Sequence, residues 1–180
     1  IFDDNKYMNQ VATKELNKLN IDFNYPKPVD FIKDIIKSVG NDSAIILDFF
    51  AGTGTTGEAV LKLNEEDGGN RRFILCTNNE NGICDNATYK RMKSIFNCGK
   101  KNTYGSLKYF KTEFIKNIGT RDQLYYDLTE KCIPMLCVKS DTYELVEKNK
   151  EFAIYSNKDK TNYSCVYFDI FGESYDTFIE

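Results

Sequence analysis

The 180-residue sequence contains no histidine. Imidazole is the commonest zinc ligand in proteins and the usual carrier of protons at neutral pH. Its absence argues against triad hydrolases and against most metalloenzymes, and we therefore expect no metal site. If the protein takes part in a reaction, the sequence indicates that a bound cofactor supplies the chemistry.

Long apolar segments and closely spaced cysteines are missing as well. No apolar run approaches the roughly 20 residues that a membrane-spanning helix requires, so we expect no membrane association. None of the six cysteines belongs to a Cys-x-x-Cys pair, and several lie inside apolar segments. This usage is typical of reduced, partly buried thiols, and we expect a cytoplasmic protein.

The net charge and the first residues also set limits. A net charge of −3 provides no general basic surface for nucleic acid. The amino-terminal segment has no signal-peptide layout and no initiator methionine, so we expect the sequence to belong to a longer chain. Residues 1–24 are polar and carry no chemical signature, and they are treated as a lead-in segment.

Two prolines introduce the first clear structural pattern. Pro26 and Pro28 fix an extended entry to residues 31–39, where apolar side chains recur at helical spacing until Gly40. Residues 44–50 then form a short apolar run, which is typical of a strand buried on both faces of a parallel sheet. The pattern predicts a helix followed by a buried strand.

A glycine loop at residues 51–57 opens into a further helix, and residues 72–77 predict a second buried strand. These segments make one β-α-β unit. The pattern continues with a helix at residues 88–96, closed by Gly99, and a third strand at residues 107–114. Beyond residue 116 we expect a different, smaller α+β region, with a helix and two strands at residues 123–135, 152–155 and 165–169.

The glycine loop has the spacing Gly52-x-Gly54-x-x-Gly57 between a predicted strand and a predicted helix. This spacing is the dinucleotide-binding fingerprint, so an NAD or FAD site is the first interpretation. The signal is weak by itself, because a flexible loop and a helix start favour many nucleotide-like ligands.

The acidic residue before the loop distinguishes between cofactors. Asp48 would repel a pyrophosphate but can accept hydrogen bonds from the ammonium group of an amino acid. S-adenosylmethionine carries such an ammonium group, whereas NAD does not. The pattern Asp48-x-Phe50-x-Gly52-x-Gly54 resembles the cofactor loop of amino-methylating DNA methyltransferases.

Two more segments extend the resemblance. Residues 25–32, which contain Lys27 and Pro28, resemble the Lys-Pro motif that lines the methionine end of the ligand in those enzymes. Residues 63–75 resemble the modification (Mod) subunits of type III restriction systems, which are adenine-N6 methyltransferases. The likeness is good from about residue 23 to residue 96 and fainter beyond.

The resemblance implies a fold, a cofactor and partners. The fold is α/β, a Rossmann-like S-adenosylmethionine-dependent methyltransferase fold with a partial parallel sheet flanked by helices and a small C-terminal α+β appendage. The implied regions are a lead-in at 1–24, an S-adenosylmethionine-binding part at 25–116 and an appended region at 117–180. The implied partners are double-stranded DNA, the restriction (Res) helicase-nuclease subunit and a second copy in a homodimer.

The resemblance also implies which residues contact the cofactor. They are Lys27, Pro28, Asp48, Phe50, Gly52, Thr53, Gly54 and Thr55. Many relatives place an acid for the ribose hydroxyls at the end of the second strand; the corresponding candidates here are Thr77 and Glu80.

One motif of the family is missing. The Asp-Pro-Pro-Tyr motif presents an acceptor to the target amino group while its aromatic ring stacks on the flipped base. The three prolines, Pro26, Pro28 and Pro134, include no adjacent pair, so we identify no catalytic residue. We expect the motif to lie upstream of residue 1 and this chain alone to be inactive. The strand before the glycine loop would then expose an apolar edge, which predicts self-association.

Simpler interpretations remain for several residues. Asp48 could cap the following turn, Lys27 could be a solvated charge, and Thr55 or Thr56 could be a helix N-cap. Four further residues are more often packing or surface residues than base-stacking platforms: Tyr89, Arg91, Tyr125 and Tyr126. At the level of function, the alternatives are an NAD-binding oxidoreductase domain and a non-catalytic module in which residues 117–180 bind a restriction subunit or a second modification subunit.

Overall fold

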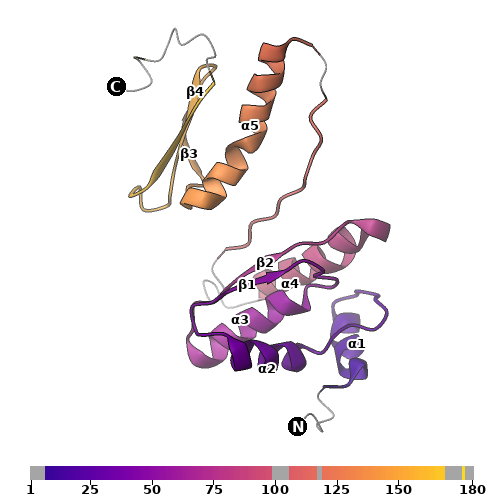
Figure 1. Cartoon of the computed structure of the whole chain (residues 1–180). Helices are drawn as coiled ribbons and strands as arrows, with labels where there is room; N and C mark the ends of the chain where they lie inside the picture. The colour runs from indigo at the N-terminus through magenta and orange to yellow at the C-terminus, as the bar shows by residue number, and fades with distance from the viewer. Residues whose placement is uncertain (1–6, 99–105, 117–118, 169–175, 177–180) are drawn as a thin grey trace. The chain divides into compact units, whose positions relative to one another are not determined.

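The computed structural model describes residues 7–98, 106–116, 119–168 and 176 of the chain. The chain divides into two compact units, Ile1–Phe110 and Lys111–Glu180 (Figure 1). Each unit is described by itself. None of the helices in the described residues is both long enough and apolar enough to cross a membrane.

Unit 1 is a mixed α/β structure, as predicted, with a small parallel sheet. Its elements are α1 (Asn9–Lys18), α2 (Val29–Val39), β1 (Ile45–Asp48), α3 (Thr55–Asp67), β2 (Arg72–Leu75), the short helices η2 (Glu80–Gly82) and η3 (Cys84–Tyr89), and α4 (Lys90–Cys98). Strand β1 pairs in parallel with β2, with Ile45 opposite Arg72 and Asp48 opposite Leu75. The β-α-β unit therefore forms as the sequence indicated.

Helices α2 and α3 cover one face of this sheet. Side chains from both helices, Val29, Ile36, Ala59, Val60 and Leu63, form a buried cluster against which Ile46 and Phe73 of the strands pack. Helix α2 begins after Pro28, whose extended backbone serves as its N-cap, and ends at Gly40. The Lys-Pro segment is thereby placed at the start of a helix that belongs to the core.

The other face of the sheet is open, and the prediction of strands buried on both faces is wrong for this chain. The exposed fractions are 56% for Ile45, 49% for Leu47 and 50% for Ile74. Because successive side chains of a strand point to opposite faces, the residues between them pack on α2 and α3 while these three remain in solvent.

The region after β2 differs from the prediction in two ways. The helix expected at 88–96 begins earlier, as the π-helical turn η3 that runs into α4. The Asn79 side-chain oxygen accepts hydrogen bonds from the backbone N–H of Cys84 and of Asp85, which starts this turn. The expected stop at Gly99 lies outside the described residues.

The third strand predicted at 107–114 is wrong. This segment has no regular secondary structure, and the boundary between the two units falls within it. The Tyr109 ring stacks on Tyr89 with centroids 4.5 Å apart, and its hydroxyl donates to Asp85. Side-chain contacts with η3 therefore hold the segment, and no strand pairing with β1 or β2 is formed.

Unit 2 combines a long helix with an antiparallel sheet. Its elements are α5 (Arg121–Ser140), β3 (Glu144–Lys148), β4 (Phe152–Ser156) and β5 (Tyr163–Tyr167), with the strand order β3-β4-β5. Ile133 and Cys137 of α5 pack on Ala153, Val166 and Phe168. The predicted helix and two strands are present, although Asp169 lies outside the described residues. Strand β3 was not predicted, because every one of its side chains is exposed.

Candidate functional site

The glycine loop between β1 and α3 has the backbone that its sequence requires. Gly52 and Gly54 have φ values of 52° and 78°, a left-handed conformation that residues with a Cβ rarely adopt. The Gly54 N–H donates to the Ala51 carbonyl at 2.7 Å, and Gly54 is the N-cap of α3. The loop is therefore a tight bend that leads directly into a helix start.

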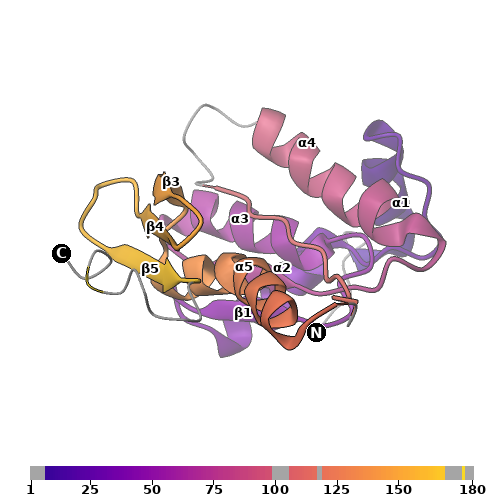
Figure 2. The same cartoon turned by 90° about the horizontal axis from the view of Figure 1, so that it is seen from above.

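The third glycine has a packing role. A Cβ added at Gly57 would lie 2.7 Å from the Met92 sulfur and 3.1 Å from a methyl group of Leu75. The missing side chain thus lets α3 approach both β2 and α4, and Figure 2 shows α4 running beside α3.

Asp48 ends β1 and lies at the base of the loop. One carboxylate oxygen accepts from the Phe50 backbone N–H at 3.0 Å, and the other accepts from the Thr56 hydroxyl at 2.6 Å. A carboxylate has about four lone-pair positions, so these two bonds leave acceptor capacity. The turn-capping role and a ligand-binding role are compatible in this geometry.

The Lys-Pro segment lies against the loop. Pro28 is buried, whereas the Lys27 side chain is exposed. The backbone carbonyl of Lys27 accepts from the Thr55 hydroxyl at 3.4 Å. Two motifs that are separate in sequence are thus brought together in space.

The remaining loop candidates differ in exposure. Thr53 and Thr55 are buried, and their hydroxyl oxygens lie 3.1 Å apart. The Phe50 side chain is 92% exposed, so it is accessible beside the loop.

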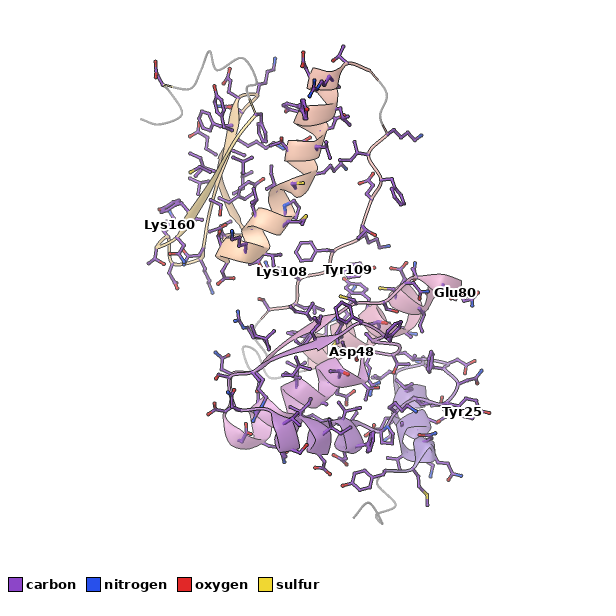
Figure 3. All side chains as sticks on the ribbon, in the orientation of Figure 1. Tyr25, Asp48, Glu80, Lys108, Tyr109 and Lys160 are labelled. Carbon is purple, nitrogen blue, oxygen red and sulfur yellow. The ribbon has the colours of Figure 1, made fainter. Side chains whose placement is uncertain are left out.

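Thr77 and Glu80 follow β2 and therefore lie at the same carboxyl edge of the sheet as Asp48. The Thr77 hydroxyl donates to the Asn78 carbonyl at 3.1 Å, and Glu80 accepts from the Asn78 amide at 3.3 Å. In Figure 3, Glu80 lies at the periphery of unit 1, away from Asp48. Within the described part of the chain, no hydrogen bond joins either residue to the glycine loop.

Two residues that contact the loop were not identified from the sequence. The Thr88 hydroxyl of η3 donates to the Gly52 carbonyl at 2.6 Å. The Arg91 side chain, which is 1% exposed, donates to Thr53 and Thr55 at 3.0 and 3.1 Å and forms an ion pair with Glu58 at 2.6 Å. One signal was available: Glu58 lies in the apolar run of α3, and a buried carboxylate requires a cation.

Glu58 is ionised in this environment. Its burial raises the pKa, but the Arg91 charge and the bond to Lys62 outweigh burial, so the pKa of Glu58 lies below its usual value. The Lys62 ammonium group is 2.8 Å from the second carboxylate oxygen. The buried arginine beside the loop is thus neutralised by a charged partner.

The fold and the loop define a class of protein: an α/β domain with a glycine bend and an acidic strand end, suited to a nucleotide-like ligand that carries a positive group. Residues 1–90, half of the chain, match the model of the family described as DNA methylase. The chain belongs to this DNA methylase family.

Comparison with individual proteins shows which methyltransferases the chain is similar to. The chain is 45% identical over 98 residues to the Mod subunit of the type III restriction-modification enzyme StyLTI of Salmonella typhimurium, covering 51% of this chain and 15% of the relative. It is 44% identical over 100 residues to the EcoPI Mod subunit of Escherichia phage P1, covering 53% and 15%. The type II methyltransferase M.KpnI of Klebsiella pneumoniae is 40% identical over 81 residues, covering 44% and 19%.

The two Mod subunits among these relatives confirm the resemblance that the sequence motifs indicated. The chain spans between 15% and 19% of the length of the three relatives.

Proposed function

We propose that this chain is the S-adenosylmethionine-binding portion of a site-specific DNA methyltransferase that methylates adenine N6 in a type III restriction-modification system. The observation that carries the proposal is the position of the Asp48 carboxylate at the end of β1, against the Gly52–Gly54 bend, with the Lys27 carbonyl bonded to the same loop. Membership of the DNA methylase family supports it.

The described residues fit this cofactor. S-adenosylmethionine, when bound, supplies an activated methyl group. Asp48 would accept hydrogen bonds from its ammonium group, because the carboxylate keeps acceptor capacity beside the bonds to Phe50 and Thr56. The amino-terminal end of α3 favours the carboxylate of the same molecule, since its first N–H groups and the helix dipole attract an anion.

The outer part of the cofactor would meet more exposed residues. The accessible Phe50 ring offers an apolar surface beside the loop, and Thr77 or Glu80 would accept from the ribose hydroxyls. In the complete protein, the sheet would belong to a Rossmann-like methyltransferase fold in which further elements cover the open face of β1 and β2.

Transfer of the methyl group requires residues that this sequence does not contain. It has no adjacent prolines and hence no Asp-Pro-Pro-Tyr motif, so we expect binding without methylation from this chain alone. We propose that another part of the whole protein supplies this motif and the contacts to double-stranded DNA. The restriction (Res) subunit and a second Mod copy are the proposed protein partners.

Calorimetric titration of the chain with S-adenosylmethionine and, separately, with NAD tests the assignment. We expect saturable binding of S-adenosylmethionine and no binding of NAD, since Asp48 repels a pyrophosphate. Binding of NAD alone would support the oxidoreductase interpretation, and heat changes for neither ligand would contradict the proposed cofactor site.

A further inference from the structure

Arg91 occupies an unusual place for a charged residue. It is the second residue of α4, and its side chain is 1% exposed. The guanidinium donates through Nε to Glu58 at 2.6 Å and through Nη1 to both loop threonines, Thr53 and Thr55. One side chain therefore joins α3, α4 and the loop that precedes α3.

The hydroxyl protons of the two threonines have a consistent arrangement. The Thr55 hydroxyl donates to the Lys27 carbonyl. Since a hydroxyl has a single proton, the 3.1 Å contact between the two threonines is then a donation from Thr53 to Thr55. Arg91 donates to both oxygens, and every hydroxyl proton in the cluster has an acceptor. Orientation of these threonines is thus determined by Arg91 on one side and by the Lys27 carbonyl on the other.

Stability alone does not account for this arginine. Replacing a buried ion pair with apolar residues of similar size is often neutral or stabilising. The Nη2 atom of Arg91 is buried and has no hydrogen-bond partner among the described residues, which adds a further cost. Burial of the Arg91 guanidinium costs free energy, yet this group bonds to the hydroxyls of both Thr53 and Thr55. This combination points to a role in the proposed cofactor loop.

We infer that Arg91 is a positioning residue for the cofactor loop: it holds Thr53 and Thr55 so that the Gly52–Gly54 bend keeps its binding conformation. Thr88 assists from the preceding turn by donating to the Gly52 carbonyl at 2.6 Å. The inference rests on the proposed function for its effect on S-adenosylmethionine, whereas its effect on the loop itself is independent of any ligand.

The test compares Arg91→Lys with a matched control, Arg71→Lys. Arg71 is also buried and also bonded to a carboxylate, with both Nη atoms 2.9 Å from Asp67, but it lies at the opposite end of α3. Arg91→Lys keeps the charge beside Glu58 and loses the fork that reaches both threonines. We expect the affinity for S-adenosylmethionine to fall on the order of tenfold in Arg91→Lys and to remain unchanged in Arg71→Lys.

A second pair of variants leaves Arg91 in place. Thr55→Val removes the hydroxyl that links Arg91 to Lys27, and Thr55→Ser keeps it. We expect weaker binding in the valine variant and near-normal binding in the serine variant. This pair keeps the inference testable if Arg91→Lys fails to fold.

Amide hydrogen exchange without ligand separates a local effect on the loop from a change in overall stability. We expect faster exchange at residues 53–56 in Arg91→Lys and Thr55→Val under conditions where each variant is folded by circular dichroism, and normal exchange there in Arg71→Lys and Thr55→Ser. Equal exchange at these residues in all variants would overturn the inference.

The two proposals fail in different ways. If the unmodified chain does not bind S-adenosylmethionine, the proposed function fails and exchange at residues 53–56 alone decides the role of Arg91. If the unmodified chain binds and Arg91→Lys binds equally well, the inference is wrong while the proposed function stands.

Discussion

Asp48 forms two hydrogen bonds within the chain, and these determine how a substitution at this position should be interpreted. The bond from the Phe50 N–H and the bond from the Thr56 hydroxyl both fix the loop. An asparagine can keep both contacts, because its oxygen accepts from Phe50 and its NH₂ group can donate to a rotated Thr56 hydroxyl. Asp48→Asn therefore removes the negative charge with little change to the turn.

We expect Asp48→Asn to weaken S-adenosylmethionine binding on the order of tenfold, since a hydrogen bond to a charged group contributes roughly 1.5–3 kcal/mol. Calorimetry measures the affinity and urea unfolding measures the stability. Asp159→Asn, in an exposed turn of unit 2, removes the same charge and should leave the affinity unchanged. Unaltered affinity in Asp48→Asn would remove the central support of the proposed function.

Some residues of the candidate site could be predicted from the sequence, and others could not. The loop glycines, Asp48 and Lys27 belong to local patterns, and the structure brings Lys27 and Thr55 together. The contacts of Arg91 depend on the path of the chain over 36 to 38 residues back to the threonines. No periodicity within α4 indicates this path, so the arginine was assigned to packing or surface.

At the scale of elements, the two ends of α3 offer a direct comparison. Both ends have a left-handed glycine, Gly54 as N-cap with φ 78° and Gly68 as C-cap with φ 72°. A Cβ at Gly54 would lie 3.3 Å from a Thr88 methyl group, whereas one at Gly68 would meet no atom within 4 Å. A residue with a Cβ would be strained in the backbone at either position, but only at Gly54 would it also meet a neighbouring side chain.

We expect both Gly54→Ala and Gly68→Ala to lower the free energy of unfolding by about 1 kcal/mol from the left-handed backbone, with a larger loss in Gly54→Ala because of the Thr88 contact. Only Gly54→Ala should also weaken S-adenosylmethionine binding. Urea unfolding and calorimetry give the two quantities. A larger loss of stability in Gly68→Ala would show that the Thr88 contact does not constrain the loop.

The secondary structure shows where element prediction succeeds. Helix α2 has strong apolar periodicity, strands β1 and β2 are short apolar runs, and glycines or prolines flank these elements and α3. All four elements contribute side chains to one core. The segment 107–114 has comparable apolar alternation but is held by the Tyr109 contacts to η3. Strand β3 has no buried side chain to produce a pattern, and it forms because β4 provides backbone pairing.

At the scale of the whole molecule, the open face of the β1–β2 sheet is the main feature to test. Ile45, Leu47 and Ile74 present adjacent apolar side chains to solvent. Exposed apolar surface of this kind favours association. The sequence predicted self-association at the edge of the strand before the glycine loop, and the open face is a further apolar surface of the same sheet.

We expect sedimentation equilibrium to show concentration-dependent self-association of the chain, and Leu47→Lys to weaken it on the order of tenfold, because a charge would be desolvated in the contact. Val39→Lys is the control, since Val39 is 84% exposed at the end of α2, the helix that packs on the opposite face of the sheet. A monomer at all concentrations, or an equal effect of both substitutions, would contradict the prediction.

The hydrogen bond between Thr55 and the Lys27 carbonyl joins segments that are 28 residues apart. Because Thr55 can donate its single proton only once, loosening of the segment before α2 would free that proton and change the partners of Thr53 and Arg91 as well. The proline-flanked entry to α2 and the glycine bend should therefore fold and unfold together as one cooperative unit.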